Sequence, residues 1–214
     1  MATLADLRSA ISDDIDDTTG EYSAQITSAI QAAIRYCERK NFYFTQSRTI
    51  TFSTVAAQQF YGAADNSLIP SLVQITDMWS EDSSGRRFII SQEEENELEY
   101  LSDNSASSGR PYAYAYFAQQ IRLYPVPDSA AYTIRVQVGA YKLTQLSADS
   151  DTNVWLTEGY DMIKARAKYI LAKDTVKDAT IAAEALNDFN DQMRVLSDET
   201  SRRGATGEIE ATCF

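Results

Sequence analysis

The chain has 214 residues, of which 44% are hydrophobic, a proportion typical of a globular protein that buries a core in one domain or two small ones. Its formal net charge of −12 opposes binding of DNA through the phosphates, and the absence of histidine excludes histidine-dependent catalytic triads and zinc sites. No apolar run is long enough to span a bilayer, and the start lacks a signal-peptide pattern, so we expect a product made in the cytosol without membrane contact.

Sequence motifs for cofactor or metal chemistry are missing. Neither a GxxxxGK[ST] phosphate loop nor a GxGxxG motif occurs, and Cys37 and Cys213 lie too far apart in the sequence for a CxxC site. We therefore predict no cofactor, no catalytic residue and no metal site, and a protein that is not an enzyme. An enzyme acting through carboxylates is the alternative, but nothing in the sequence selects two acids for that role.

Residues 1–20 are predicted to form an acidic leader with a short helix over 4–11. Its acidic cluster consists of Asp13, Asp14, Asp16 and Asp17. The cluster lacks the glycine and the distal glutamate of a calcium loop, so it indicates a solvated linker rather than a cation site. Thr18 and Glu21 then match a capping box, which predicts a helix that ends near Asn41 and is followed by an aromatic junction.

Residues 45–153 form the predicted β-rich part. Period-two segments occur at residues 49–52, 59–61, 72–79 and 87–90, and the first two are predicted to form a hairpin through 53–58. An acidic helix over 92–101 follows, and we interpret its glutamates as a solvated face rather than as catalytic acids. The strongest β signal is 110–138, which predicts three strands joined as an antiparallel meander.

Three tyrosines share one side of the first meander strand, because side chains alternate along a strand. They are Tyr112, Tyr114 and Tyr116. We interpret this aromatic face as core or interface, and a stacking platform for sugars or bases is the alternative.

Residues 154–199 predict a helix hairpin, with helices over 155–171 and 175–199. The first helix carries two apolar lines, which require two neighbours in its own domain or one of them in another subunit. We assign Leu156, Ile163 and Ile170 to the home core. We assign Trp155, Met162 and Tyr169 to a neighbouring subunit.

Residues 200–214 are predicted to be a flexible docking tail. Arg202 and Arg203 begin a cationic hinge, and the last seven residues alternate polar and apolar side chains. Such a segment can add to an exposed sheet edge of a partner, with pockets for Ile209 and Phe214. A frayed terminus without a role is the alternative.

These patterns together predict an α+β fold. One long N-terminal helix and a C-terminal helix hairpin are expected to pack with an antiparallel β region inserted between them. The helical part comprises residues 21–44 and 154–199.

The order of these parts resembles a protein family. The segments RYCERKNFYF, GRPYAYAYFAQQIRLYPVPD and WLTEGYDMIKARAKYILAKD are similar to the head-to-tail adaptors of tailed bacteriophages, also called gatekeepers or head-completion proteins. The similarity covers most of residues 21–199 and is closest to the adaptors of short-tailed phages. It implies a virion protein that forms a ring, commonly of twelve subunits, beneath the portal, extends the DNA channel, retains the packaged genome and provides a platform for the tail or nozzle.

The resemblance also implies roles for the candidate residues. The C-terminal segment is expected to dock on the portal protein through Arg202, Arg203, Ile209 and Phe214. The acidic leader is not part of the resemblance, and from the net charge of −12 we hypothesise that acidic side chains, with the leader's cluster among the candidates, give the ring a negative bore through which DNA passes without specific binding. A carbohydrate-binding or receptor-binding β module with a helical base is the alternative function.

Overall fold

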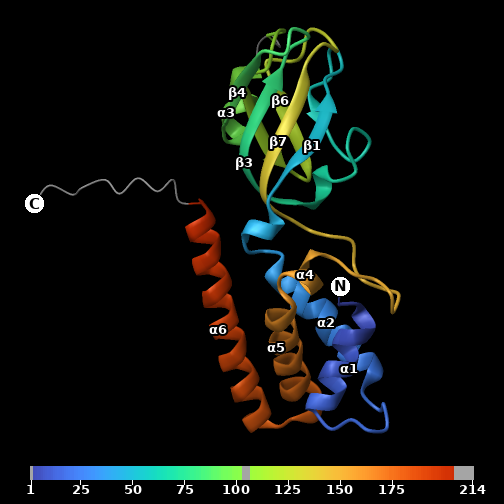
Figure 1. The fold of residues 1–214 in the computed structure, drawn as a ribbon. Coiled ribbons are helices and arrows are strands. Elements are labelled where there is room, and N and C mark those ends of the chain that lie inside the picture. Colours follow the sequence, from blue (N-terminus) through green and yellow to red (C-terminus); the bar gives the residue numbers. More distant parts are fainter. Residues whose placement is uncertain (1, 103–106, 205–214) are drawn as a thin grey trace, which may run out of the picture. The chain divides into compact units, whose positions relative to one another are not determined.

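The computed structural model describes residues 2–102 and 107–204, which divide into two compact units (Figure 1). The helical unit comprises Met1–Thr45 and Thr144–Phe214, and the β unit comprises Gln46–Leu143. The β unit is therefore inserted into the helical unit by sequence.

The helical unit is organised around one central helix. Its elements are α1 (Leu4–Asp14), α2 (Ser23–Cys37), the 3-10 turn η1 (Tyr43–Thr45), α4 (Val154–Thr157), α5 (Tyr160–Leu171), the π-helical turn η3 (Ala172–Val176) and α6 (Ala179–Gly204). Helix α5 packs against α1, α2 and α6 (Figure 1). Both long sides of α5 thus have a partner within the same unit.

The helix expected within the acidic leader is present as α1, but it packs into the helical unit and is not part of a solvated linker. Leu4, Leu7 and Ile11 recur at three and four, and all three are fully buried. Thr3 and Asp6 form a reciprocal capping box: the Asp6 amide donates to Thr3 Oγ1 at 3.2 Å, and the Thr3 amide donates to Asp6 Oδ2 at 2.8 Å. Residues 1–20 are therefore part of the helical unit, because their apolar stripe packs on α2 and α5.

The start of α2 differs from the predicted capping box. Gly20 adopts a left-handed conformation with φ of 71°, so the helix cannot begin at Thr18. The Asp17 carboxylate accepts instead from the backbone amides of Glu21 and Tyr22, both at 3.0 Å. Asp17 thus satisfies amides that precede the helix, which is a structural role rather than one at a channel surface.

The boundary after the β region also differs from the prediction. Residues 144–153 belong to the helical unit. Leu146 is buried, and its carbonyl accepts from Gln31 Nε2 at 3.2 Å. The amide of Leu4 donates to the Asp151 carbonyl at 2.9 Å. This loop joins the unit because it supplies hydrogen-bond acceptors to α1 and α2.

The β unit is built on one seven-stranded sheet. Its strands are β1 (Ser47–Ser53), β2 (Phe60–Tyr61), β3 (Leu72–Glu81), β4 (Arg87–Gln92), β5 (Ala113–Phe117), β6 (Gln120–Tyr124) and β7 (Thr133–Tyr141). A 3-10 turn, η2 (Ile69–Ser71), precedes β3, and helix α3 (Glu95–Ser102) follows β4. The strand order is β1-β7-β3-β4-β5-β6-β2, antiparallel except between β4 and β5.

The predicted three-strand meander is wrong in its last step. Strands β5 and β6 form an antiparallel hairpin, turning at Ala118 and Gln119, which both have positive φ. Strand β7, however, pairs with β1 and β3. The long connection 125–132 contains Pro125 and Pro127, which donate no ladder hydrogen bonds, so nothing local holds β7 beside β6.

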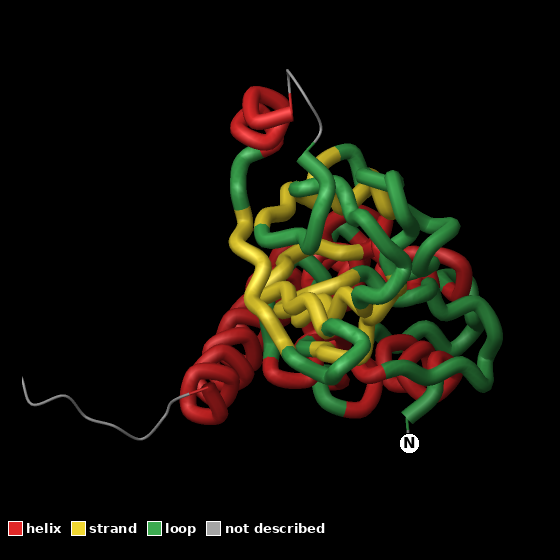
Figure 2. Tube along the Cα trace, turned by 90° about the horizontal axis from the view of Figure 1, so that it is seen from above, coloured by secondary structure: helices red, strands yellow, loops and turns green. Residues whose placement is uncertain are grey.

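The sheet curls around a single apolar core (Figure 2). Every strand contributes at least one buried side chain to it. Phe52 of β1 and Tyr61 of β2 belong to the two edge strands, yet their rings lie 4.8 Å apart. The first and last strands therefore meet across the core, and side chains that point inward are inaccessible to partners.

Candidate functional site

The C-terminal end of α6 holds two of the predicted portal-docking residues. Arg202 and Arg203 lie in the last turn of this helix, so they are not part of a flexible hinge as predicted. The Arg203 guanidinium stacks on the Tyr43 ring at 3.7 Å, and its Nη2 donates to Glu199 Oε1 at 2.6 Å. Ile209 and Phe214, the other two predicted docking residues, lie outside the described residues.

Hydrogen bonds fasten this helix end to the segment after α2. The Tyr43 amide donates to Thr200 Oγ1 at 3.2 Å, and the Tyr43 hydroxyl donates to Glu158 Oε2 at 2.8 Å. The hydrogen bond to Glu158 raises the pKa of Tyr43, so the hydroxyl keeps its proton at neutral pH. The chain therefore continues beyond α6 from a fixed point of the helical unit.

An aromatic cluster packs against the ring of Tyr43. Phe44 packs edge-on against Tyr43 and Trp155, with ring centroids 5.2 Å apart in both pairs. Phe42 stacks on Phe44 at 5.4 Å. Such ring pairs add about 0.5–1.5 kcal/mol each beyond the area they bury. The predicted aromatic junction is thus part of the helical core, and it positions the end of α6.

The predicted subunit-interface line on α4 and α5 requires a correction. Trp155 is 0% exposed and Met162 is 1% exposed, so neither side chain can reach a neighbouring subunit. Tyr169 is partly exposed and lies beside the Arg166 guanidinium at 5.0 Å. The second apolar line is buried because α5 has two sets of neighbours within its own unit, which is the first of the two possibilities that the sequence left open.

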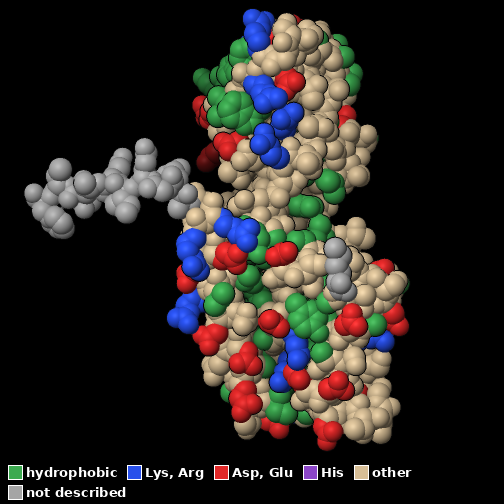
Figure 3. All heavy atoms as spheres, in the orientation of Figure 1, with side chains coloured by type: hydrophobic (Ala, Val, Ile, Leu, Met, Phe, Trp, Pro, Cys, Tyr) green, Lys and Arg blue, Asp and Glu red, His purple; other side chains and the backbone are tan. Residues whose placement is uncertain are grey.

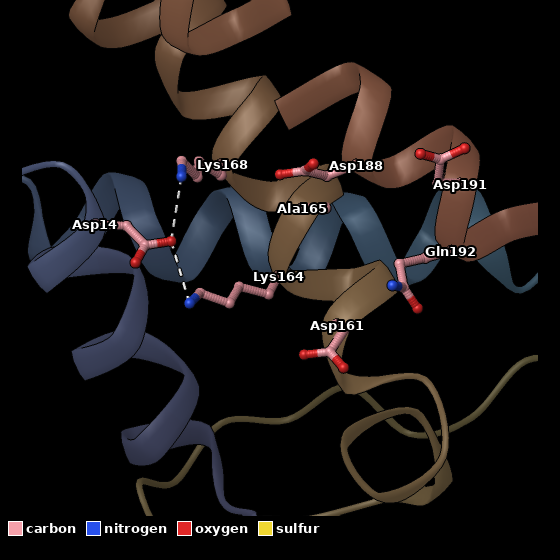
Figure 4. A pocket seen from close by; sticks show the side chains of 8 residues that line it. All are labelled: Asp14, Asp161, Lys164, Ala165, Lys168, Asp188, Asp191 and Gln192. Atoms are coloured by element: carbon pink, nitrogen blue, oxygen red, sulfur yellow. Dashed lines mark hydrogen bonds and ion pairs between the residues drawn. The ribbon is translucent and has the colours of Figure 1, made fainter. Parts of the chain in front are cut away.

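The four aspartates predicted to line a channel have different roles. Asp14 accepts ion pairs from Lys164 and Lys168, at 3.1 and 3.2 Å (Figure 4). Burial raises the pKa of Asp14, but the hydrogen bonds from the two lysines outweigh burial and hold the pKa below its ordinary value. Asp17 accepts backbone amides as described above, whereas Asp13 and Asp16 are exposed.

Asp14 also borders an open pocket of about 340 Å³ between α5 and α6 (Figure 4). Three further carboxylates line it: Asp161, Asp188 and Asp191. Four carboxylates thus face two lysine ammonium groups, so the pocket is acidic. In the described part of the chain, no group of three metal-ligating side chains has a geometry that could hold a metal ion.

The three tyrosines do not form one exposed face. Tyr114 is 1% exposed and belongs to the core of the curled sheet. Tyr116 is partly buried, and its hydroxyl donates to the Ile69 carbonyl at 2.9 Å. Tyr112 is 52% exposed, precedes β5 and packs edge-on against Tyr124. The interpretation as core is therefore right for Tyr114, whereas the alternative, a stacking platform of three exposed rings, does not fit because Tyr114 is buried and Tyr116 is partly buried.

Sequence reasoning missed a buried ionic cluster in the β unit. Arg122 of β6 is 3% exposed and pairs with two glutamates of α3, Glu95 at 2.6 Å and Glu99 at a shorter distance. The predicted solvated face of this helix is therefore only half right. The available sequence signal was the position of Arg122 between two apolar residues, Ile121 and Leu123, in a predicted strand. The structure shows that both faces of this strand are covered, so the arginine is buried.

Comparison with known proteins identifies the family. No curated protein matches this chain. The family described as SU10 adaptor protein matches residues 2–209, a range that includes both the helical unit and the β unit. In the described ranges, no helix has the length and apolarity needed to cross a bilayer. The chain therefore belongs to the SU10 adaptor protein family and is a bacteriophage adaptor protein.

Proposed function

We propose that this protein is the head-to-tail adaptor of a short-tailed phage. It assembles as a ring of twelve subunits beneath the portal, extends the DNA channel, retains the packaged genome and carries the tail or nozzle. The observation that carries the proposal is the family match over residues 2–209, since it spans both units and not one common fold element. In this proposal the helices line the ring, and the β unit faces outward or toward the tail.

Charge supports passage of DNA without binding. The chain carries a net charge of −12, and the pocket between α5 and α6 presents four carboxylates against two ammonium groups. A wall of this sign repels phosphates, so it does not hold the genome by attraction. Asp13 and Asp16, which are exposed, remain candidates for the bore.

The fastened end of α6 supports docking of residues 205–214 on the portal. A docking segment that starts from a fixed point loses less conformational entropy on binding than one that starts from a mobile hinge. Tyr43, Thr200 and Arg203 provide that fixed point.

Deletion of residues 205–214 tests the proposal. This truncation removes none of the contacts described at the end of α6, so the melting temperature should remain within about 1 °C of the full chain. Cosedimentation with purified portal rings should fall to background. Wild-type protein that neither binds portal rings nor completes DNA-filled heads overturns the proposed function.

A second truncation provides the control. Deletion from Thr200 onward removes the Tyr43 contacts as well, so it should also lower the melting temperature. Unimpaired portal binding by both truncations would place the docking surface elsewhere. A compact trimer that binds glycans without affinity for the portal favours the receptor-binding module instead.

A further inference from the structure

The outer face of the β unit carries a cationic pocket of about 350 Å³. It is lined by Arg48 of β1, Trp79 and Glu81 of β3, Arg87 of β4, and Arg135 and Gln137 of β7. Figure 3 shows Lys and Arg side chains gathered around apolar ones on this unit. Three guanidinium groups around one carboxylate are unusual in a chain whose net charge is −12.

Strand register explains how the pocket forms. Trp79 lies opposite Arg135 on one side and opposite Ile89 on the other, and Glu81 lies opposite Arg87. The Glu81 carboxylate accepts from Arg87 Nε at 2.9 Å and lies 3.8 Å from Arg135 Nη2. Since one carboxylate cannot neutralise three guanidinium groups, the pocket retains positive charge next to an indole ring.

The apolar part of this surface is exposed as well. Ile89, next to Trp79 across the strands, is 57% exposed, and the Arg87 side chain is 54% exposed. A partner that suits the pocket therefore supplies carboxylates together with an aromatic or aliphatic side chain.

Helix α3 of the same unit presents that combination. Glu97, Tyr100 and Leu101 are spaced at three and four, so they share one helix face. Tyr100 is 79% exposed and Leu101 is 41% exposed. The exposed Glu93 and Glu94 precede the helix and add negative charge.

Contacts on the opposite side hold α3 in place within its own chain. Leu98 is fully buried and packs with Ala113 and Ala115 of β5, while Glu95 and Glu99 pair with Arg122. Helix α3 is thus fixed on β5, whereas the cationic pocket lies on β1, β3, β4 and β7. Seen from above, α3 lies at the edge of the β unit, outside the curled sheet (Figure 2).

We propose that the cationic pocket of one subunit receives the exposed face of α3 from the next subunit. The two surfaces are different, so the contact is head-to-tail, and repetition of such a contact closes a ring when the rotation allows. This inference rests on the ring of the proposed function and assigns residues to its subunit contact. DNA is the less suitable occupant, because the chain repels polyanions and the pocket holds only a few side chains.

Charge reversal on each side provides the test. Arg87→Glu lowers the formal charge of the pocket from +2 (three arginines and one glutamate) to zero, and Glu97→Lys places a cation on the α3 face that meets the pocket. Each single variant should associate with itself roughly tenfold more weakly than wild type in sedimentation at low salt, because the attraction between the two surfaces is reduced. The association of wild type should weaken with added salt.

Mixing the two variants identifies the geometry. An Arg87→Glu subunit retains a normal α3, and a Glu97→Lys subunit retains a normal pocket, so an equimolar mixture should form a one-to-one dimer that grows no further. The double variant carries both reversals and should associate with itself again. Arg39→Glu and Glu184→Lys, at exposed side chains of the helical unit, are matched controls that should behave as wild type.

Outcomes separate the two proposals. Self-association of either single variant at the wild-type level, or a mixture without dimers, overturns the assigned contact. If these variants still form complete rings on portal rings, the contact is wrong while the adaptor function stands. If wild type never binds portal rings, the adaptor function fails, and the dimer in the free mixture still decides the contact.

Discussion

Substitution of Arg122 by methionine should strongly destabilise the β unit. Methionine fills a similar volume but leaves Glu95 and Glu99 facing each other without a counterion. The Glu95 side chain is 25% exposed, and its Oε2 atom is buried without a hydrogen-bond partner among the described residues. Breaking a buried ion pair on one side costs about 3–5 kcal/mol, and the 74% exposure of Glu99 places the expected loss near the lower limit, at about 3 kcal/mol.

The charge state of Arg122 supports this magnitude. Burial lowers the pKa of the guanidinium, but its hydrogen bonds to Glu95 and Glu99 outweigh burial and raise the pKa above its ordinary value. Arg122 therefore stays a cation throughout the accessible pH range, and its removal always removes a charge. Loss of the pair leaves α3 held by the buried Leu98 and by weaker contacts such as the hydrogen bond that the Tyr124 hydroxyl donates to the Leu101 carbonyl at 3.4 Å.

Hydrogen exchange followed by mass spectrometry is the appropriate assay, because it reports on the two units separately. Peptides from α3, β5 and β6 should lose protection by a factor of roughly one hundred, which corresponds to about 3 kcal/mol. Peptides from α5 and α6 should not change. Arg86→Met, at a side chain that is 73% exposed, should have an effect below about 0.5 kcal/mol.

A triple variant separates charge from packing. Adding Glu95→Gln and Glu99→Gln to Arg122→Met removes the unpaired charges, so it should restore most of the lost protection. Protection of α3 in Arg122→Met within a factor of five of wild type would refute the reasoning, since it would mean that the ion pairs contribute little to holding the helix.

Three further predictions concern the helical unit. The pKa of Asp14 is lowered in the fold, so its ion pairs stabilise the protein above about pH 4, and this stabilisation is lost as the pH falls through the folded pKa. Asp14→Asn should therefore lower the free energy of unfolding by about 0.5–1 kcal/mol at pH 7 and by almost nothing at pH 3. Equal decreases in thermal melts at the two pH values would contradict this. Burial raises the pKa of Cys37 to about 12, so a Cys213→Ser protein should resist iodoacetamide at pH 8 until it is denatured, and rapid alkylation of the native protein would argue against the buried thiol. Met162→Ala should cost about 2–5 kcal/mol in urea denaturation, whereas Val195→Ala, at a side chain that is 51% exposed, should cost less than about 0.5 kcal/mol; similar losses would contradict the burial of Met162.

The sequence predicted most elements because their signals are local. Helices α2, α5 and α6 follow three-and-four spacing, and β1, β3 and β7 follow alternation, so each could be read within its own segment. Helix α1 was expected only as a short helix within a solvated acidic leader, because acidic residues dominate the composition of that segment. Nevertheless, Leu4, Leu7 and Ile11 recur at the spacing of one helix face, and these three side chains are sufficient for α1 to pack against α2 and α5.

The candidate sites were predicted less well because burial depends on residues distant in sequence. Tyr114 and Trp155 both lie on apolar faces, and no local pattern states whether such a face meets the same chain or another subunit. Arg122 shows the converse, since its partners Glu95 and Glu99 belong to another element that had been read as solvated. The cationic pocket could not be predicted for the same reason: its arginines come from β1, β7 and β4, which only the folded sheet brings together on either side of β3.

The burial of both apolar lines of α5 determines which type of subunit contact the proposed ring can have. A subunit that reserved Trp155 and Met162 for its neighbour would expose a broad apolar face before assembly, as obligate oligomers do. Here those side chains complete the subunit's own core, and the cationic pocket and the exposed face of α3 are instead strongly charged. Contacts of that type are weak between free subunits and sensitive to salt, because charged groups retain much of their hydration until both surfaces meet. On the proposed function, such subunits would associate only weakly when free and would close the ring where the portal brings them close, which would disfavour rings away from a filled head.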